Sequence, residues 1–184
     1  MKQVFDGALE ELGAALGRVD AEAVGGACEM LAGARRVVVY GCGREGLMMR
    51  GLAMRLYHLG LDAHVQGEMS TPPVGAGDLL FVSAGPGELA TVAALMRVAR
   101  DAGAQVLFLT AEPGADSARL ATRVLAIPAQ TMARDRNAGA SAVLPMGSVF
   151  EGAMFVLFEV MVAMLRDHLG ISAEAMRANH TNLE

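Results

Sequence analysis

The chain has 184 residues and a mass of 19.1 kDa, which fits one domain that can bury most of its apolar surface. A composition of 53% hydrophobic and 19% charged residues excludes a disordered chain and indicates more buried surface than a lone monomer needs. The net charge of −5 argues against non-specific nucleic-acid binding, which depends on clustered Lys and Arg.

The cellular setting follows from the cysteines and the apolar stretches. Cys28 and Cys42 cannot form a disulfide framework, so we expect a reducing compartment. The N-terminus shows no signal peptide, and the longest apolar stretch, residues 152–165, is interrupted by Glu159. These features predict a cytoplasmic protein without a membrane span.

The first 33 residues predict helix, because apolar residues recur at helical spacing from Val4 to Val24. The pair Gly25 and Gly26 is a candidate break, and Asp20 can cap a second helix that runs to Leu31.

From residue 36 onward, short apolar runs alternate with helical patterns. Strands are expected over residues 36–40, 62–66, 78–83, 105–110 and 123–127. Helices are expected over residues 45–59, 88–102, 116–122 and 148–168, with a short helix before the tail. Residues 130–141 are polar and lack periodicity, which predicts a loop, either mobile over a site or simply connecting. The alternation predicts an α/β fold with a parallel sheet in three layers.

Two glycine turns follow predicted strands, where ligands bind in an open parallel sheet. Residues 41–46 read Gly-Cys-Gly-Arg-Glu-Gly, and residues 84–88 read Ala-Gly-Pro-Gly-Glu. Glycine allows close approach of the backbone, and the helix N-terminus that follows favours anions. The candidate binding residues here are Gly41, Gly43, Ser83, Gly85, Gly87 and Glu88. The glycines can equally serve packing alone.

The spacing at residues 41–46 also fits a dinucleotide fingerprint. However, Gln66 and Gly67 stand where that fingerprint needs an acidic residue at the end of the second strand, and Glu68 lies just beyond. We expect no cofactor and no metal.

Five further segments occur in order along the chain. They are Arg-Gly-Leu-Ala-Met-Arg-Leu-Tyr-His-Leu-Gly (50–60), Gly-Glu-Met-Ser-Thr-Pro (67–72), Gly-Asp-Leu-Leu (77–80), Pro-Met-Gly-Ser-Val-Phe-Glu (145–151) and His-Thr-Asn-Leu-Glu (180–184). With them, the chain resembles the sugar isomerase (SIS) domain family, and within it the 6-phospho-3-hexuloisomerases. The resemblance covers nearly the whole chain. It implies one SIS domain over residues 1–184, with a five-stranded parallel sheet of flavodoxin type flanked by helices, and a homotetramer. The N-terminal helices, about 1–33, would pack on the sheet or on a neighbouring subunit.

The resemblance also implies catalytic roles for Glu151 and His180. Such enzymes move a proton between C2 and C3 of a ketohexose phosphate through an enediol, which needs a base and a proton shuttle. Glu151 would be the base, and His180 the shuttle or the group that polarises the carbonyl. Ser148 and Glu151 also have capping-box spacing, with Ser148 as N-cap. A histidine near a chain end is otherwise typically a solvated surface residue.

Further positions match the family's binding site. Arg44 could hold an anion with two hydrogen bonds. Arg55 fits either the site or an ion pair between subunits, and Glu68 could accept sugar hydroxyls or be merely hydrated. Thr71 and Ser148 complete the candidate binding residues. We interpret His58 as structural.

The chain departs from the family at its phosphate cradle. Glu45, Ala84, Pro86 and Leu89 stand where the family has hydroxyl donors, and Pro86 also lacks a backbone N–H. Each hydrogen bond lost to a charged group costs about 1.5–3 kcal/mol. The sequence therefore predicts weak phosphate binding, unless Ser83 and Ser141 compensate.

Two functions remain open. One is an isomerase acting on a sugar whose tail is not an ordinary phosphate, and the other is a non-catalytic sugar or phosphosugar binder on the same scaffold. Either acts on a small sugar-like ligand in a homo-oligomer, with no nucleic acid or membrane as partner.

Overall fold

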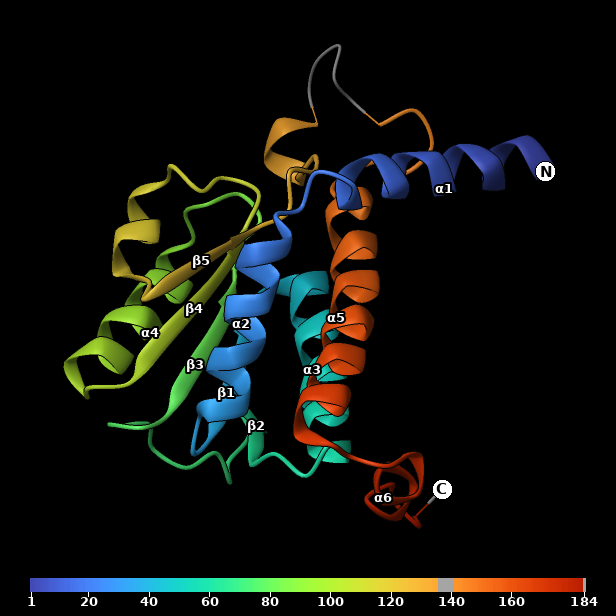
Figure 1. Cartoon of the computed structure of the whole chain (residues 1–184). Helices are drawn as coiled ribbons and strands as arrows, with labels where there is room; N and C mark the ends of the chain where they lie inside the picture. Colours follow the sequence, from blue (N-terminus) through green and yellow to red (C-terminus); the bar gives the residue numbers. More distant parts are fainter. Residues whose placement is uncertain (136–140, 184) are drawn as a thin grey trace.

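The computed structural model of the chain describes residues 1–135 and 141–183 (Figure 1). Residues 136–140 of the expected loop and Glu184 of the tail lie outside this range. The helices are α1 (Lys2–Leu16), α2 (Ala21–Gly33), α3 (Gly43–His58), α4 (Ala90–Asp101), α5 (Ser148–Leu169) and α6 (Ala173–Ala178), with short 3-10 helices η1 (Asp116–Leu120) and η2 (Met132–Arg134).

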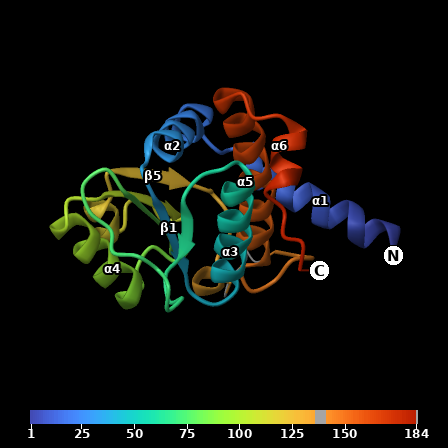
Figure 2. The same cartoon turned by 90° about the horizontal axis from the view of Figure 1, so that it is seen from below.

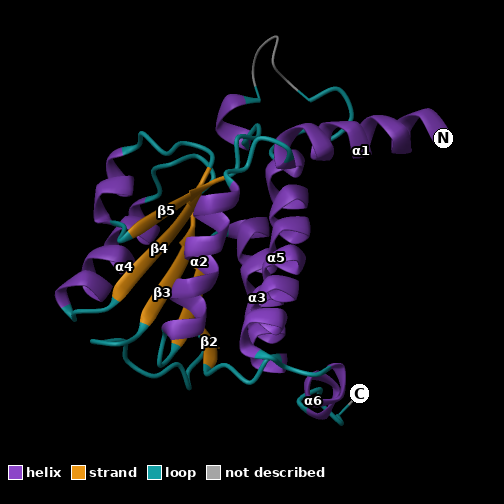
Figure 3. Ribbon diagram, viewed as in Figure 1, coloured by secondary structure: helices purple, strands orange, loops and turns teal. Residues whose placement is uncertain are grey.

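A five-stranded parallel sheet forms the centre (Figure 3). Its strands are β1 (Val37–Gly41), β2 (Ala63–Val65), β3 (Leu79–Ser83), β4 (Gln105–Thr110) and β5 (Arg123–Ala126), in the order β2-β1-β3-β4-β5. Every residue of β3 is buried, as a continuous apolar run in a sheet covered on both faces requires. The expected α/β fold and the flavodoxin-type strand order are confirmed.

Helices cover both faces of the sheet (Figure 2). One core cluster joins α2, α3 and α5 to β1 and β3, and a second joins α4 to the opposite face. Phe158 of α5 packs edge-on against Phe81 of β3, with ring centroids 5.9 Å apart. The three layers predicted from the sequence are present.

The N-terminal region differs from the sequence prediction at one point. The helix continues through Gly25 and Gly26, and the break falls earlier, between Leu16 and Ala21. Asp20 caps α2 as expected, since its carboxylate accepts a hydrogen bond from the Glu22 N–H at 2.9 Å. Gly26 instead permits close packing, because a Cβ there would lie 2.4 Å from the Arg123 guanidinium carbon.

Helix α5 is long and apolar enough to cross a membrane by length and composition alone, with a mean hydropathy of 1.9 over its most apolar window. Half of that window is buried inside the protein, where α5 packs on α1, α2 and α3. The core helix of a soluble protein passes the same test, so this is weak evidence for a membrane. The exposed part of α5 carries Phe155, Val156, Val160 and Met164.

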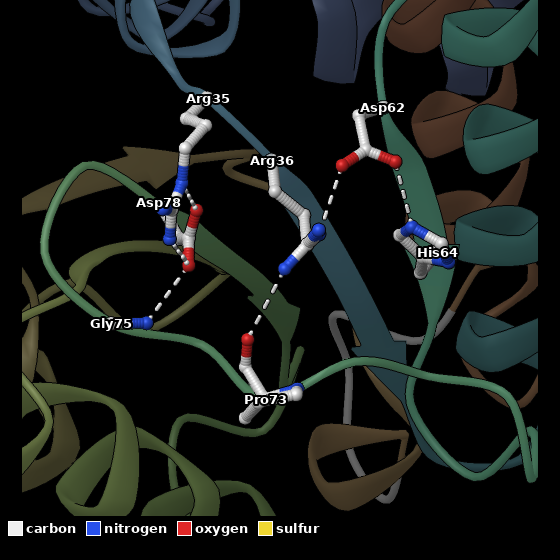
Figure 4. Close-up of polar contacts among 7 residues, drawn as sticks. All are labelled: Arg35, Arg36, Asp62, His64, Pro73, Gly75 and Asp78. Atoms are coloured by element: carbon white, nitrogen blue, oxygen red, sulfur yellow. Dashed lines mark hydrogen bonds and ion pairs between the residues drawn. The ribbon is translucent and has the colours of Figure 1, made fainter.

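A polar network lies where β1, β2 and β3 begin (Figure 4). The buried Asp78 carboxylate accepts two hydrogen bonds from Arg35, both 2.9 Å, and one from the Gly75 N–H. Asp62 accepts a hydrogen bond from Arg36 and contacts the His64 ring at 2.8 Å. These contacts connect the segments that lead into β1, β2 and β3, at the end of the sheet opposite the glycine turns.

Candidate functional site

A cavity of about 370 Å³ lies where β1 and β3 end and α3 and α5 begin. This is the edge at which ligands bind in open parallel sheets. Its lining residues are Cys42, Gly43, Arg44, Glu45, Pro86, Leu89, Thr131, Met132, Met146, Gly147, Phe150 and Glu151. Three candidate site residues thus line the cavity, namely Gly43, Arg44 and Glu151. So do three residues that replace hydroxyl donors of the family, namely Glu45, Pro86 and Leu89.

The first glycine turn is built for a tight passage from strand to helix. A Cβ on Gly46 would lie 2.5 Å from the Gly41 carbonyl oxygen, so these two glycines serve close packing of α3 on β1. Gly43 has a φ of +56°, which a side chain rarely tolerates, and an added Cβ would meet no atom within 4 Å. The packing interpretation therefore applies to Gly41 and Gly46, and Gly43 stays beside the cavity.

Arg44 pairs with the candidate base. Its Nη2 lies 2.8 Å from Glu151 Oε2, its Nη1 donates to the Ser148 hydroxyl at 2.9 Å, and it also donates to the Met146 carbonyl. The guanidinium expected to hold an anion of the ligand thus already holds the anion of Glu151.

The capping box that the spacing of Ser148 and Glu151 offered as an alternative does not form. The N-cap of α5 is Gly147 with a φ of +86°, and Ser148 is the first helical residue, with its hydroxyl engaged by Arg44. A capping box needs the acidic residue three positions after the N-cap, and Glu151 is four positions after Gly147. The Glu151 side chain lines the cavity instead. The backbone at Met146 is also left-handed, with a φ of +56°. For a non-glycine residue such a conformation is uncommon, and it is found chiefly at functional sites.

Burial raises the pKa of Glu151, while the Arg44 charge lowers it and the nearby Glu45 charge raises it further. Among the described residues, two buried side-chain oxygens form no hydrogen bond. They are Glu151 Oε2, whose contact is the ion pair with Arg44 Nη2, and Thr131 Oγ1. Both residues line this cavity. Buried polar atoms without any partner are rare, so Thr131 Oγ1 marks a place where a ligand can supply a hydrogen bond.

Glu45 turns from α3 toward the second glycine turn. Its carboxylate accepts hydrogen bonds from the Gly85 N–H, at 3.0 and 3.1 Å, and from the Ser83 hydroxyl. Burial raises the pKa of Glu45, and these hydrogen bonds only partly offset that rise. Ser83 therefore does not supply a free donor. Nor does Ser141, whose hydroxyl donates to Glu11 of α1.

Other candidate residues lie away from the cavity, each with a partner of its own. Arg55 of α3 forms an ion pair with Glu159 of α5 at 3.1 Å within the chain. Glu68 lies 3.8 Å from Arg50, and the Thr71 hydroxyl donates to the Val65 carbonyl.

The Glu88 carboxylate accepts hydrogen bonds from the backbone and hydroxyl of Ser117, at the start of η1. Gly87 has a φ of +89° in the turn before it, and a Cβ there would lie 2.8 Å from Glu112 Cβ. Through these contacts, Gly87 and Glu88 pack the second glycine turn against η1 and the residues just before it.

His180 lies at the other end of the α3–α5 pair. Its ring stacks on His58, the last residue of α3, with centroids 5.2 Å apart. Glu151 is in the first turn of α5, and α6 follows the far end of that helix (Figure 1). At about 1.5 Å per residue, the two candidate catalytic groups are on the order of 20 Å apart within one chain. His58 is buried and also contacts Arg55.

Sequence reasoning missed several lining residues. Thr131 and Met132 belong to a polar segment without periodicity, and Met146 and Phe150 lie inside the motif at residues 145–151, in which other residues were the candidates. Thr131 and Met132 become candidates only in the fold, where their segment lies beside the start of α5. Among residues 1–135 and 141–183, no three His, Cys, Asp or Glu side chains gather closely enough to hold a metal ion.

Comparison with known proteins agrees with this architecture. Residues 30–156 match the model of the SIS domain family. The chain is 38% identical over 175 residues to the 3-hexulose-6-phosphate isomerase of Mycobacterium gastri, covering 95% of this chain and 87% of that one. It is 32% identical over 150 residues to the protein of the same name from Bacillus subtilis, covering 81% and 80%. The chain belongs to the SIS domain family.

Solved structures share the fold. The crystal structure of a hypothetical protein superimposes with a TM-score of 0.88 at 27% identity, covering 98% of this chain and 96% of that one. The NanR protein of Vibrio vulnificus, complexed with ManNAc-6P, superimposes with a TM-score of 0.77 at 21% identity, covering 96% of this chain and 66% of that one.

Proposed function

We propose that this chain is a sugar isomerase that interconverts 3-keto and 2-keto hexoses through an enediol, on a substrate altered from that of its relatives. The observation that carries the proposal is the Glu151 carboxylate, which lines the cavity and is held in place there by an ion pair with Arg44. The relatives in Mycobacterium gastri and Bacillus subtilis, both named 3-hexulose-6-phosphate isomerase, support the reaction class.

The reaction needs only proton movements. Glu151 removes the proton from C2 of the 3-keto sugar, and the electron pair forms the C2–C3 double bond of the enediol as the carbonyl oxygen gains a proton. The hydroxyl at C2 then loses its proton to become the carbonyl, and C3 receives one. A base with a raised pKa suits this work, because it takes a carbon-bound proton more readily than an ordinary carboxylate does. Arg44 orients the carboxylate through its contacts to Glu151 and Ser148.

His180 serves as the proton shuttle only if it comes from another copy of the chain. The on-chain separation of His180 from Glu151 supports a site shared between subunits of a homotetramer. Exposed apolar side chains also favour an interface, namely Val4, Phe5 and Leu9 on α1 and Phe155, Val160 and Met164 on α5. Light scattering at micromolar concentration is expected to give a tetramer, and a monomer mass would contradict this assembly.

The decisive experiment mixes two inactive variants. Glu151→Gln and His180→Ala are each expected to exchange no sugar C–H proton for deuterium in D₂O, measured by NMR with fructose and fructose 6-phosphate. Refolded together, they are expected to recover part of the exchange, since mixed oligomers contain sites with both groups intact. Two Glu151→Gln preparations mixed in the same way are the control. Exchange that never returns in the mixture would count against a shared site, and a wild-type chain that exchanges no proton would count against the isomerase.

A non-catalytic sugar binder is the second candidate. One observation favours it: the Arg44 guanidinium already contacts Glu151 and the Met146 carbonyl. It therefore has no free pair of N–H donors with which to bind a phosphate. The NanR structure bound to ManNAc-6P has this fold. Saturable sugar binding without any deuterium exchange would identify this function.

A further inference from the structure

The donors of the second glycine turn already hold an anion, and it belongs to the chain itself. The Gly85 N–H donates to both carboxylate oxygens of Glu45, and the Ser83 hydroxyl donates to Oε2. A backbone N–H and a hydroxyl at the carboxyl end of a parallel strand are the groups that would otherwise hold a bound phosphate.

There is little room at this point for a second anion. A Cβ added to Gly85 would lie 3.0 Å from Glu45 Oε1 and 2.9 Å from Phe150 Cε1. The neighbouring Pro86 offers no N–H, and Leu89 offers only apolar contact to the cavity. A phosphate would have to displace the Glu45 carboxylate or lie beside its charge.

No cation offsets that charge within residues 1–135 and 141–183. Arg44, one residue away on α3, directs its guanidinium to Glu151, Ser148 and Met146, and Glu45 forms no ion pair in the described chain. With Glu151, the cavity holds two carboxylates against one guanidinium. Its electrostatics disfavour a dianion.

A second observation indicates what the cavity does accept. Thr131 is 3% exposed and lines the cavity, and its Oγ1 has no hydrogen-bond partner among the described residues. A buried hydroxyl of this kind can donate to or accept from a ligand hydroxyl. The carboxylate of Glu45 offers further acceptor lone pairs on the same cavity wall.

We propose that Glu45 is a specificity-determining residue, whose carboxylate fills the anion position of the second glycine turn, so that the cavity takes an uncharged, hydroxyl-bearing ligand end there. Thr131 contributes a hydrogen bond to the same ligand. The sugar class rests on the proposed function, whereas the exclusion of phosphate rests on the contacts of Glu45 and does not depend on turnover.

The test measures binding of inorganic phosphate to the whole protein by calorimetry. The unmodified chain is expected to bind phosphate no tighter than millimolar, and Glu45→Ser to bind it about tenfold tighter or more, because the substitution frees two donors and removes a charge. Glu22→Ser is the matched control, since it removes an exposed carboxylate from the first turn of α2. Micromolar affinity in the unmodified chain would overturn the proposal, as would an equal gain in Glu22→Ser. Glu45→Ala provides the same test should Glu45→Ser fail to fold.

Two measurements on the unmodified protein need no variant. The amide NMR signal of Gly85 is expected to stay in place when millimolar phosphate is added, and a saturable shift of that signal would overturn the proposal. Fructose is expected to bind at least as tightly as fructose 6-phosphate, and tighter binding of the phosphorylated sugar would overturn it. Neither result depends on turnover, so failure of the isomerase would appear separately, as absent deuterium exchange.

Discussion

Arg44 Nη2 lies 2.8 Å from Glu151 Oε2, across the cavity end of two helices that are far apart in the sequence. The same guanidinium is bonded to the Ser148 hydroxyl and the Met146 carbonyl. Arg44 is thereby a positioning residue for Glu151. It also lowers the pKa of a carboxyl that burial raises.

Removing Arg44 is expected to disturb the base in two ways. Arg44→Met leaves Glu151 buried without its cation, so the pKa of Glu151 rises and the acid limb of the kcat/KM profile moves to higher pH. Turnover at the optimum is expected to fall by about 10²-fold, because the carboxylate also loses its orientation. Arg44→Lys restores the charge and is expected to bring the acid limb back toward its original position. An unchanged pH profile in Arg44→Met would contradict the role of Arg44 as a positioning residue for Glu151.

Neutralising the base itself separates catalysis from helix capping. Glu151→Gln is expected to lower turnover by about 10²–10⁴-fold, as for loss of a positioned general base. Its Tm is expected to stay close to that of the unmodified chain, because Gly147 rather than Ser148 is the N-cap and the Glu151 side chain caps nothing in the described residues. A lowered Tm with unchanged turnover would restore the capping interpretation.

The pH dependence of stability reports on Glu45. Burial raises the pKa of this carboxyl in the folded state, so the folded protein binds its proton more tightly than the unfolded chain does. Its contribution to stability is therefore lost as pH rises from the unfolded pKa, about 4.3, through the folded value. Glu45→Gln keeps an acceptor for the Gly85 N–H without the charge. The variant is expected to gain stability relative to the unmodified chain as pH rises to 7, measured by urea unfolding, and a loss would contradict the assignment.

Asp78 is expected to behave in the opposite way. Its hydrogen bonds from Arg35, followed by that from Gly75, hold its pKa below the usual range against the effect of burial. The stabilisation is present above the unfolded pKa, about 3.9, and is lost as pH falls through the folded value. Asp78→Asn is expected to lower the free energy of unfolding at pH 7 by about 1–3 kcal/mol. The difference in the free energy of unfolding between Asp78→Asn and the unmodified chain should shrink as the pH falls. Asp62→Asn is the control and should lower that free energy less, because the Asp62 carboxylate is more exposed.

The sequence by itself determined the layers of this protein and the edge of the sheet that carries the site. Residues 79–82 are apolar at every position, and this local property predicts burial on both faces whatever the rest of the chain does. The glycine turns follow strands in the sequence, so their position at the carboxyl edge was predictable. The resemblance to the SIS family added Glu151 and the altered cradle.

Only the tertiary structure decided which groups face one another. In the sequence, Glu45 appeared as the replacement of a hydroxyl donor of the family. In the fold, its carboxylate accepts the hydrogen bonds of Ser83 and Gly85. Ser148 has the spacing of an N-cap, yet its hydroxyl is bonded to Arg44, more than one hundred residues earlier. His180 and Glu151 lie at opposite ends of α3 and α5. Periodicity and turn chemistry are local, whereas these partnerships depend on how α3 and α5 pack side by side, which no short stretch of sequence encodes.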